Sequence, residues 1–204
     1  MGKKTNSTDT IIKAATSVFA DTGYSGARVD EIAKRAGVNK ATIYYNIGNK
    51  EVLYSKVLQS IFGKTLASVE EMIDAAESPE KKLKIYIRNI AKTIDLNPGF
   101  PNILMWEHAA GGKNLPSDII LIIGRMLNKL TTILKEGEQK GLFSKQTPIL
   151  IQFMIISTMT FYKTSEPIRK RHRELPDSVR NHPEDLSGSI VAELETLILN
   201  AVRK

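Results

Sequence analysis

Residues 32–51 read IAKRAGVNKATIYYNIGNKE, and the spacing of small and apolar residues in this stretch predicts two short helices joined by a tight turn. Ala33 lets two helices approach closely, and Gly37 adopts a positive φ at little cost, as the turn between them requires. Val38 and Ile43 then face inward and hold the second helix against the first. The stretch therefore predicts a helix-turn-helix.

The outward face of the second helix carries side chains that suit a DNA duplex. Lysine donates to phosphate or guanine, threonine binds phosphate or touches a thymine methyl group, and alanine permits close approach to base edges. Adjacent helical positions point about 100° apart, so Tyr44 and Tyr45 face different directions. The alternative that both rings only cover the core is therefore the weaker one. Lys50, at the start of the next helix, suits a further phosphate. The residues of the second helix concerned are Lys40, Ala41, Thr42, Tyr44 and Tyr45.

Helical periodicity continues along the chain, and no convincing strand pattern interrupts it. Ser78-Pro79 and Thr147-Pro148 each pair a capping hydroxyl with a proline at the first helical position. We expect an all-α fold of about nine helices. Besides the two helices of the motif, their ranges are about 8–22, 49–75, 79–95, 101–110, 117–140, 147–165 and 190–202.

The charge of the chain is basic, and the surplus is concentrated at its N-terminal end. There are 29 Lys and Arg against 22 Asp and Glu, a formal net charge of +7, which favours a polyanionic partner such as nucleic acid or an anionic membrane surface. Residues 1–60 hold nine basic and five acidic residues. We therefore expect a helix-turn-helix domain of three helices over 1–48. The rest, 49–204, would be a larger helical domain, connected through the helix at 49–75.

Several classes of protein do not fit the sequence. The chain has no cysteine, so it has no disulfide and no thiolate site, which agrees with a cytoplasmic location. Its three histidines lack a metal-ligand spacing, and no nucleophile elbow or phosphate-binding loop occurs. No apolar run approaches the roughly 20 residues of a membrane span, and no signal peptide is evident. We expect a protein of the cytoplasm without catalytic residues, cofactor, metal site or membrane anchor.

Residues 8–57 resemble the N-terminal DNA-binding domain of TetR-family transcriptional regulators. The resemblance implies a sequence-specific DNA-binding regulator, a repressor that a small-molecule effector releases from a palindromic operator. It also implies a homodimer formed through the last two helices. A transcriptional activator and an architectural DNA-binding protein without an effector are the alternatives. The matching stretch is FADTGYSGARVDEIAKRAGVNKATIYYNIGNKEVLYSKVL (residues 19–58), with landmarks at Phe19, Gly23, Tyr24, Ile32, Ala33, residues 36–38, Tyr44, Tyr45 and residues 49–51.

The chain departs from the family pattern at two places. Asn46 and Ile47 stand where the family usually has histidine and phenylalanine; Asn46 can still donate to phosphate or pair with adenine, and Ile47 can still plug the core. Ala27 and Arg28 stand where a threonine or serine commonly opens the first helix of the motif. The candidate DNA-binding residues are Arg28, Asn39, Lys40, Ala41, Thr42, Tyr44, Tyr45, Asn46 and Lys50.

By the same resemblance, the larger domain binds the effector and forms the dimer. The helix at 147–165 is apolar nearly all round, which requires burial on several sides, in a core or against another subunit. An apolar pocket with a few polar anchors is typical of a ligand site, although ordinary core packing is the alternative for each residue. The basic run at 168–174 we interpret as a mobile, solvated loop. The candidate effector residues are Tyr86, Phe100, Met105, Trp106, His108, Phe153, Met159 and Tyr162.

Arg28 generates a first prediction, because its fixed charge takes the place of the missing hydroxyl contact to phosphate. Arg28→Ala should lower the slope of log affinity against log salt concentration by roughly 0.9, the value of one phosphate contact. Titration of operator DNA at several salt concentrations measures this slope. An unchanged slope would show that Arg28 makes no such contact.

Overall fold

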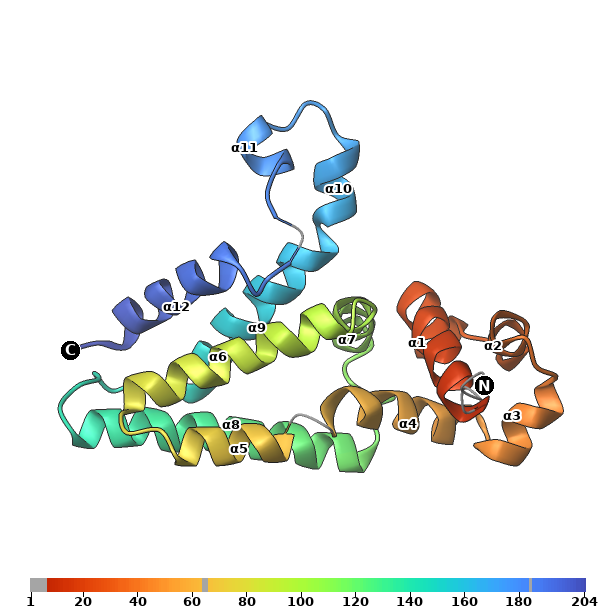
Figure 1. Cartoon of the computed structure of the whole chain (residues 1–204), viewed down its shortest axis with the longest axis horizontal. Helices are drawn as coiled ribbons and strands as arrows, with labels where there is room; N and C mark the ends of the chain where they lie inside the picture. Colours follow the sequence, from red (N-terminus) through yellow and green to blue (C-terminus); the bar gives the residue numbers. More distant parts are fainter. Residues whose placement is uncertain (1–6, 64–65, 184) are drawn as a thin grey trace, which may run out of the picture. The chain divides into compact units, whose positions relative to one another are not determined.

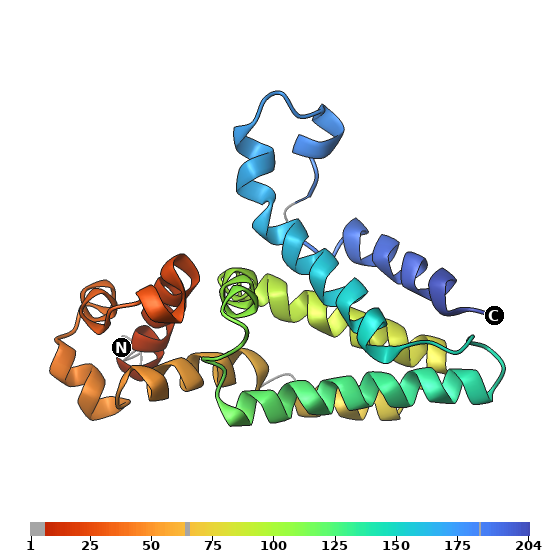
Figure 2. The same ribbon diagram turned by 180° about the vertical axis from the view of Figure 1, so that it is seen from behind.

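The computed structural model describes residues 7–63, 66–183 and 185–204, and the regular secondary structure in these ranges is helical apart from one isolated bridge between Phe143 and Arg203 (Figures 1 and 2). The predicted all-α class is confirmed. The helices in the described ranges are α1 (Ser7–Gly26), α2 (Val29–Ala36), α3 (Lys40–Asn46), α4 (Lys50–Phe62), α5 (Leu66–Asp74), α6 (Pro79–Leu96), α7 (Phe100–Ala109), α8 (Ser117–Gln139), α9 (Pro148–Thr164), α10 (Glu166–Arg171), α11 (Asp177–Arg180) and α12 (Ser189–Val202).

The described residues hold more helices than the nine expected. The helix expected over 49–75 is two helices, α4 and α5, on either side of residues 64–65, which lie outside the described ranges. The loop interpretation of the basic run at 168–174 is wrong for residues 168–171, which belong to α10. A proline in the first turn of α10 and a 2.7 Å ion pair between Lys170 and Glu166, four residues apart, stabilise this short helix.

The chain divides into two compact units, which we describe separately: Met1–Gly63 with Gly99–Ile120, and Lys64–Pro98 with Leu121–Lys204. This grouping places α4 and α7 with the N-terminal helices, whereas the sequence predicts both in the second domain. The expected boundary at residue 48 stays a prediction. No helix among the described residues combines the length and apolar character that crossing a membrane demands.

In the first unit, aromatic rings join α1 to α4. The ring centroids of Phe19 and Tyr54 lie 4.7 Å apart, and those of Tyr24 and Tyr54 lie 5.0 Å apart. Such tilted and edge-on pairs are favourable beyond the area they bury. The core around them is apolar and consists mainly of Ile11, Ala15, Val18, Ile32, Ala33, Ile43, Ile47, Leu53, Val57 and Leu58.

Helix α7 packs against α1 at a glycine that no other residue could replace without strain. Gly23 has φ 67° and ψ 175°, a conformation open essentially to glycine alone. A Cβ atom there would lie 3.0 Å from Cδ2 of Trp106, and the Trp106 indole N–H donates to the carbonyl of Ala20 at 3.2 Å. The indole therefore covers the bend in α1 and fixes α7 beside it.

In the second unit, α6 contacts α5, α9 and α12, and α9 also contacts α12. Helices α5 and α8 lie side by side, joined by ion pairs from Arg125 to Glu70 (2.8 Å) and from Lys129 to Asp74 (2.9 Å) (Figures 1 and 2). The core is formed mainly by Leu83, Ile87, Ile94, Leu130, Ile133, Ile151, Ile155, Met159 and Ile198.

Candidate DNA-binding surface

Helices α2 and α3 are joined as the sequence predicts. Gly37 has φ 65° and ψ 31°, and Val38 donates its N–H to the carbonyl of Ala33 at 3.0 Å. Asn39 caps α3, because its side-chain oxygen accepts from the N–H of Thr42 at 2.7 Å and from the Thr42 hydroxyl at 2.8 Å. Ile43 is fully buried, which orients α3 with one apolar side inward.

The outward side of α3 carries two exposed aromatic residues. Tyr44 is 48% exposed and Tyr45 is 91% exposed, so the alternative that both rings cover the core is wrong. Ala41 and Asn46 are exposed as well, whereas Ile47 is buried, as expected for a core plug. The carboxamide oxygen of Asn39 serves the helix cap, which leaves its amide nitrogen as the group that can donate to DNA.

The basic candidates differ in their surroundings. The ammonium of Lys40 lies 2.9 Å from Oδ2 of Asp30, and this hydrogen bond raises the pKa of Lys40. The Lys50 ammonium lies 4.5 Å from the centroid of the Tyr24 ring, and partial burial lowers the pKa of Lys50. Arg28 is exposed at the N-cap of α2 and makes no capping hydrogen bond with its side chain.

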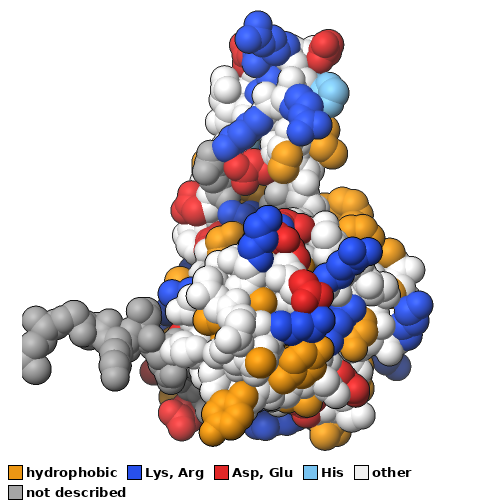
Figure 3. Space-filling model, turned by 90° about the vertical axis from the view of Figure 1, so that its right-hand side faces the viewer, with side chains coloured by type: hydrophobic (Ala, Val, Ile, Leu, Met, Phe, Trp, Pro, Cys, Tyr) orange, Lys and Arg blue, Asp and Glu red, His pale blue; other side chains and the backbone are white. Residues whose placement is uncertain are grey.

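A further arginine on α2 is engaged within the protein. Arg35 donates to Asp21 at 2.6 Å, to Ser17 at 2.9 Å and to Glu31 at 3.0 Å, and the bonds to Asp21 and Glu31 raise its pKa. Figure 3 looks onto the end that carries α2 and α3, and there Lys and Arg side chains lie among acidic and hydrophobic ones. Ion pairs with acidic side chains thus neutralise part of the positive charge of this surface.

A buried carboxylate joins α4 to α7 in the same unit. Glu107 is 4% exposed, and its Oε1 accepts from the Tyr54 hydroxyl at 2.8 Å and from the Asn114 amide at 3.2 Å. Burial, and then the bond to Glu107, raise the pKa of Tyr54. Tyr54 and Glu107 lie far apart in the sequence, so helical periodicity gives no signal for this contact.

The candidate effector residues fall in both units. In the first, Met105 is partly buried, His108 is exposed, Trp106 contacts α1, and the Phe100 ring lies 5.1 Å from that of Phe62. In the second, Tyr86 is buried and donates to Gln152 at 2.6 Å. Met159 is buried as well, and Phe153 is half exposed. The effector pocket stays a prediction.

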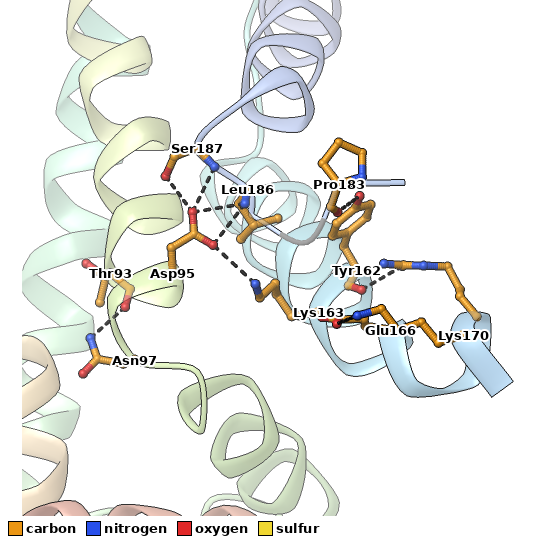
Figure 4. A network of polar contacts seen from close by, with 11 residues as sticks. Thr93, Asp95, Asn97, Tyr162, Lys163, Glu166, Lys170, Pro183, Leu186 and Ser187 are labelled. Carbon is orange, nitrogen blue, oxygen red and sulfur yellow. Dashed lines mark hydrogen bonds and ion pairs between the residues drawn. The ribbon is translucent and has the colours of Figure 1, made fainter. Parts of the chain in front are cut away.

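Tyr162, the remaining candidate, belongs to a group of polar contacts that the sequence analysis did not identify (Figure 4). Its hydroxyl donates to the carbonyl of Pro183 at 2.6 Å. Nearby, Asp95 on α6 accepts from the Leu186 N–H (3.0 Å), the Ser187 N–H (2.9 Å) and the Ser187 hydroxyl (2.6 Å), with Lys163 of α9 at 3.5 Å. Asp95 therefore fixes the segment that leads into α12.

Helix α9 has two different apolar sides. Ile151, Ile155 and Met159 are buried in the second unit. Leu150, Phe153 and Phe161 are 56%, 49% and 59% exposed, and they recur at helical spacing on the other side. On α12, Leu197 is 57% exposed. The described residues of one chain thus cover α9 on one side only.

Comparison with known proteins gives consistent matches along the chain. Residues 11–57 match the model of bacterial regulatory proteins of the tetR family, and residues 79–171 match a tetracyclin repressor-like C-terminal domain. The chain is 30% identical over 164 residues to the HTH-type transcriptional repressor NicS of Pseudomonas putida, covering 77% of this chain and 75% of NicS. It is 31% identical over 131 residues to the fatty acid metabolism regulator protein of Bacillus subtilis, covering 64% of this chain and 68% of that protein.

Solved structures agree with these matches. HlyIIR, a hemolysin II transcriptional regulator, superposes with a TM-score of 0.69 over 97% of both chains, at 24% sequence identity. The transcriptional regulator FadR of Bacillus subtilis, in complex with stearoyl-CoA, superposes with a TM-score of 0.61 at 26% identity, covering 92% of this chain and 97% of that one.

The contacts of Asp95 generate a prediction about acid stability. Burial acts to raise the pKa of Asp95, but the hydrogen bonds from Ser187 and Leu186 and the charge of Lys163 hold it below its ordinary value. A carboxyl group whose pKa is lower in the folded than in the unfolded state stabilises the fold at pH values above its unfolded pKa, which is about 3.9 for aspartate. This stabilisation is lost as the pH falls through the pKa of the folded state. At neutral pH, Asp95→Asn should lower the free energy of unfolding by about 1–3 kcal/mol.

Urea unfolding at neutral pH and at several pH values below about 4 measures this difference. The difference in the free energy of unfolding between wild type and Asp95→Asn should shrink over the acid range, because protonation of Asp95 removes the same charge from the wild type. Glu138→Gln, at an exposed position on α8, is the control and should change little. A difference for Asp95→Asn that is the same at every pH would contradict the assignment to its charge.

Proposed function

This chain belongs to the TetR family of bacterial regulatory proteins, and on that premise we propose that it represses transcription by inserting α3 into the major groove of a palindromic operator. The observation that carries the proposal is the orientation of α3: Ile43 is fully buried while Tyr44 and Tyr45 are exposed. In the helix-turn-helix arrangement the second helix enters the groove and its N-terminal residues approach the base edges. The chain is a DNA-binding transcriptional regulator. We propose the form of its operator and the contacts that its residues make with DNA.

The exposed residues divide between bases and phosphates. Lys40 and Ala41, in the first turn of α3, face base edges. Tyr44 contacts the groove, and Tyr45, the more exposed ring, contacts the sugar-phosphate backbone. The N-terminus of α4, with Lys50 in its first turn, holds a phosphate through its N–H groups and positive end.

Binding to a palindrome requires two copies related by a two-fold axis, and we assign the dimer contact to α9 and α12. Large side chains such as Leu150, Phe153 and Phe161 recur on the uncovered side of α9, and burial of such residues against a second copy removes apolar surface from water. The long apolar helix then has both of its sides buried.

Release from the operator is assigned to a small-molecule effector that binds the larger helical unit. The structure of FadR from Bacillus subtilis carries stearoyl-CoA, so a relative of similar fold binds a small molecule. In this chain, the buried Tyr86 hydroxyl and its partner Gln152 lie among apolar residues, the combination of polar anchor and apolar lining typical of ligand sites.

Selection from a random pool of duplexes tests the regulator assignment. We expect the protein to enrich a palindrome whose half-sites are about one helical turn apart, or a multiple of it, and to bind it at least about a thousandfold more tightly than unrelated DNA. Competition with unrelated DNA measures that ratio. Enrichment of no site, with equal competition by all duplexes, would support an architectural DNA-binding protein instead.

The dimer assignment predicts the effect of a charge on the uncovered side of α9. Phe153→Glu should weaken self-association by roughly tenfold or more, because two carboxylates would be buried near a two-fold axis. Operator affinity should fall with it. Sedimentation equilibrium measures the association. Met72→Glu, at a comparably exposed apolar residue on α5, should leave association unchanged, and equal effects of the two variants would place the dimer contact elsewhere.

A further inference from the structure

One ion pair connects the two helices of the DNA-binding motif on its exposed face. Lys40 is the first residue of α3, and Asp30 is the second residue of α2. The Lys40 ammonium donates to Asp30 Oδ2 at 2.9 Å, and the two side chains are 46% and 69% exposed. A cation proposed to contact DNA is thus paired with a carboxylate of the same motif.

We propose that Asp30 is a specificity-determining residue, which opposes the use of Lys40 on phosphates of unrelated DNA while leaving Lys40 able to donate to a base edge. This inference rests on the proposed insertion of α3 into the major groove.

The donor capacity of lysine makes the two kinds of contact unequal. An ammonium has three N–H donors, so Lys40 can keep its bond to Asp30 and still donate to O6 and N7 of a guanine. A phosphate is itself an anion, and Asp30 then places a second negative charge beside it. The carboxylate therefore tolerates the base contact and disfavours the phosphate contact.

The exposure of the pair makes it easy to rearrange. Surface ion pairs contribute little to stability and are screened by salt, so Asp30 matters little for folding. Non-specific DNA binding, in contrast, consists almost entirely of phosphate neutralisation by cations. Removing the carboxylate should free one cation for that purpose. Its effect should therefore fall on non-specific affinity rather than on the operator complex.

The neighbouring residue provides a matched control. Glu31 has the same charge on the same helix, but it pairs with Arg35 at 3.0 Å, and Arg35 is also held by Asp21 at 2.6 Å. Glu31→Gln removes one negative charge from this region without releasing Lys40. A general effect of net charge on DNA affinity should appear in both variants, whereas an effect through Lys40 should appear only in Asp30→Asn.

The experiment measures the affinity of wild type, Asp30→Asn and Glu31→Gln for the selected operator and for an unrelated duplex by fluorescence anisotropy at several salt concentrations. For Asp30→Asn, we expect affinity for unrelated DNA to rise roughly three- to tenfold at low salt, with a salt slope steeper by about 0.9. Operator affinity should change less than about twofold, so the specificity ratio falls. In the background Lys40→Met, the Asp30→Asn gain should disappear.

Three results would overturn the role of Asp30. These are equal effects of Asp30→Asn and Glu31→Gln, equal gains on operator and unrelated DNA, and persistence of the gain without Lys40. If wild type prefers no duplex at all, it is the regulator assignment that fails. A clear operator preference that is unchanged in Asp30→Asn rejects only the role of Asp30. Urea unfolding of each variant checks that the folded state is retained.

Discussion

The burial of Ile43 is the contact on which the recognition surface depends. Helix α3 has seven residues, far fewer than the roughly 12–15 that an isolated helix needs to be even marginally stable in water. It persists because Ile43 and Ile47 are buried in the first unit and because Asn39 and Asn49 cap α3 and α4. The direction of every polar side chain on α3 follows from that anchoring, since rotation of the helix would require exposing Ile43.

The sequence predicts this part of the molecule well because its determinants are local. The turn glycine, the capping asparagine and the inward isoleucine lie within seven residues, Gly37 to Ile43, and their spacing alone specifies the geometry. The burial of Ile47 follows from the same pattern, even though the family usually has phenylalanine there. Contacts between residues that are distant in the sequence produce no local pattern of this kind. Tyr54 and Glu107 are 53 positions apart, and Asp95 and Ser187 are 92 apart.

Outside the motif, the sequence specifies less of the structure, because the deciding contacts are not local. The segment after α9 is rich in proline and charge, which favours a loop, but pairing of Lys170 with Glu166 supports a short helix that a hydrophobic pattern cannot reveal. The candidate effector residues were grouped by aromatic character and expected family topology. In the structure, Trp106 and Phe100 contact helices of the first unit, so side-chain type alone did not identify their neighbours.

Helix α7 packs against α1 although α5 and α6 lie between them in the sequence. This order determines when the first unit can be completed during synthesis. The first unit consists of residues 1–63 and 99–120, so the indole of Trp106 and the carboxylate of Glu107 reach their partners only after α5 and α6 have been synthesised. At about 5–20 residues per second, a nascent chain waits several seconds between the appearance of Tyr54 and that of Glu107. During this interval the aromatic cluster of Phe19, Tyr24 and Tyr54 lacks the residues of α7 that contact α1 and Tyr54. Translation rate over this intervening segment therefore bears directly on how long that apolar surface is open to a chaperone.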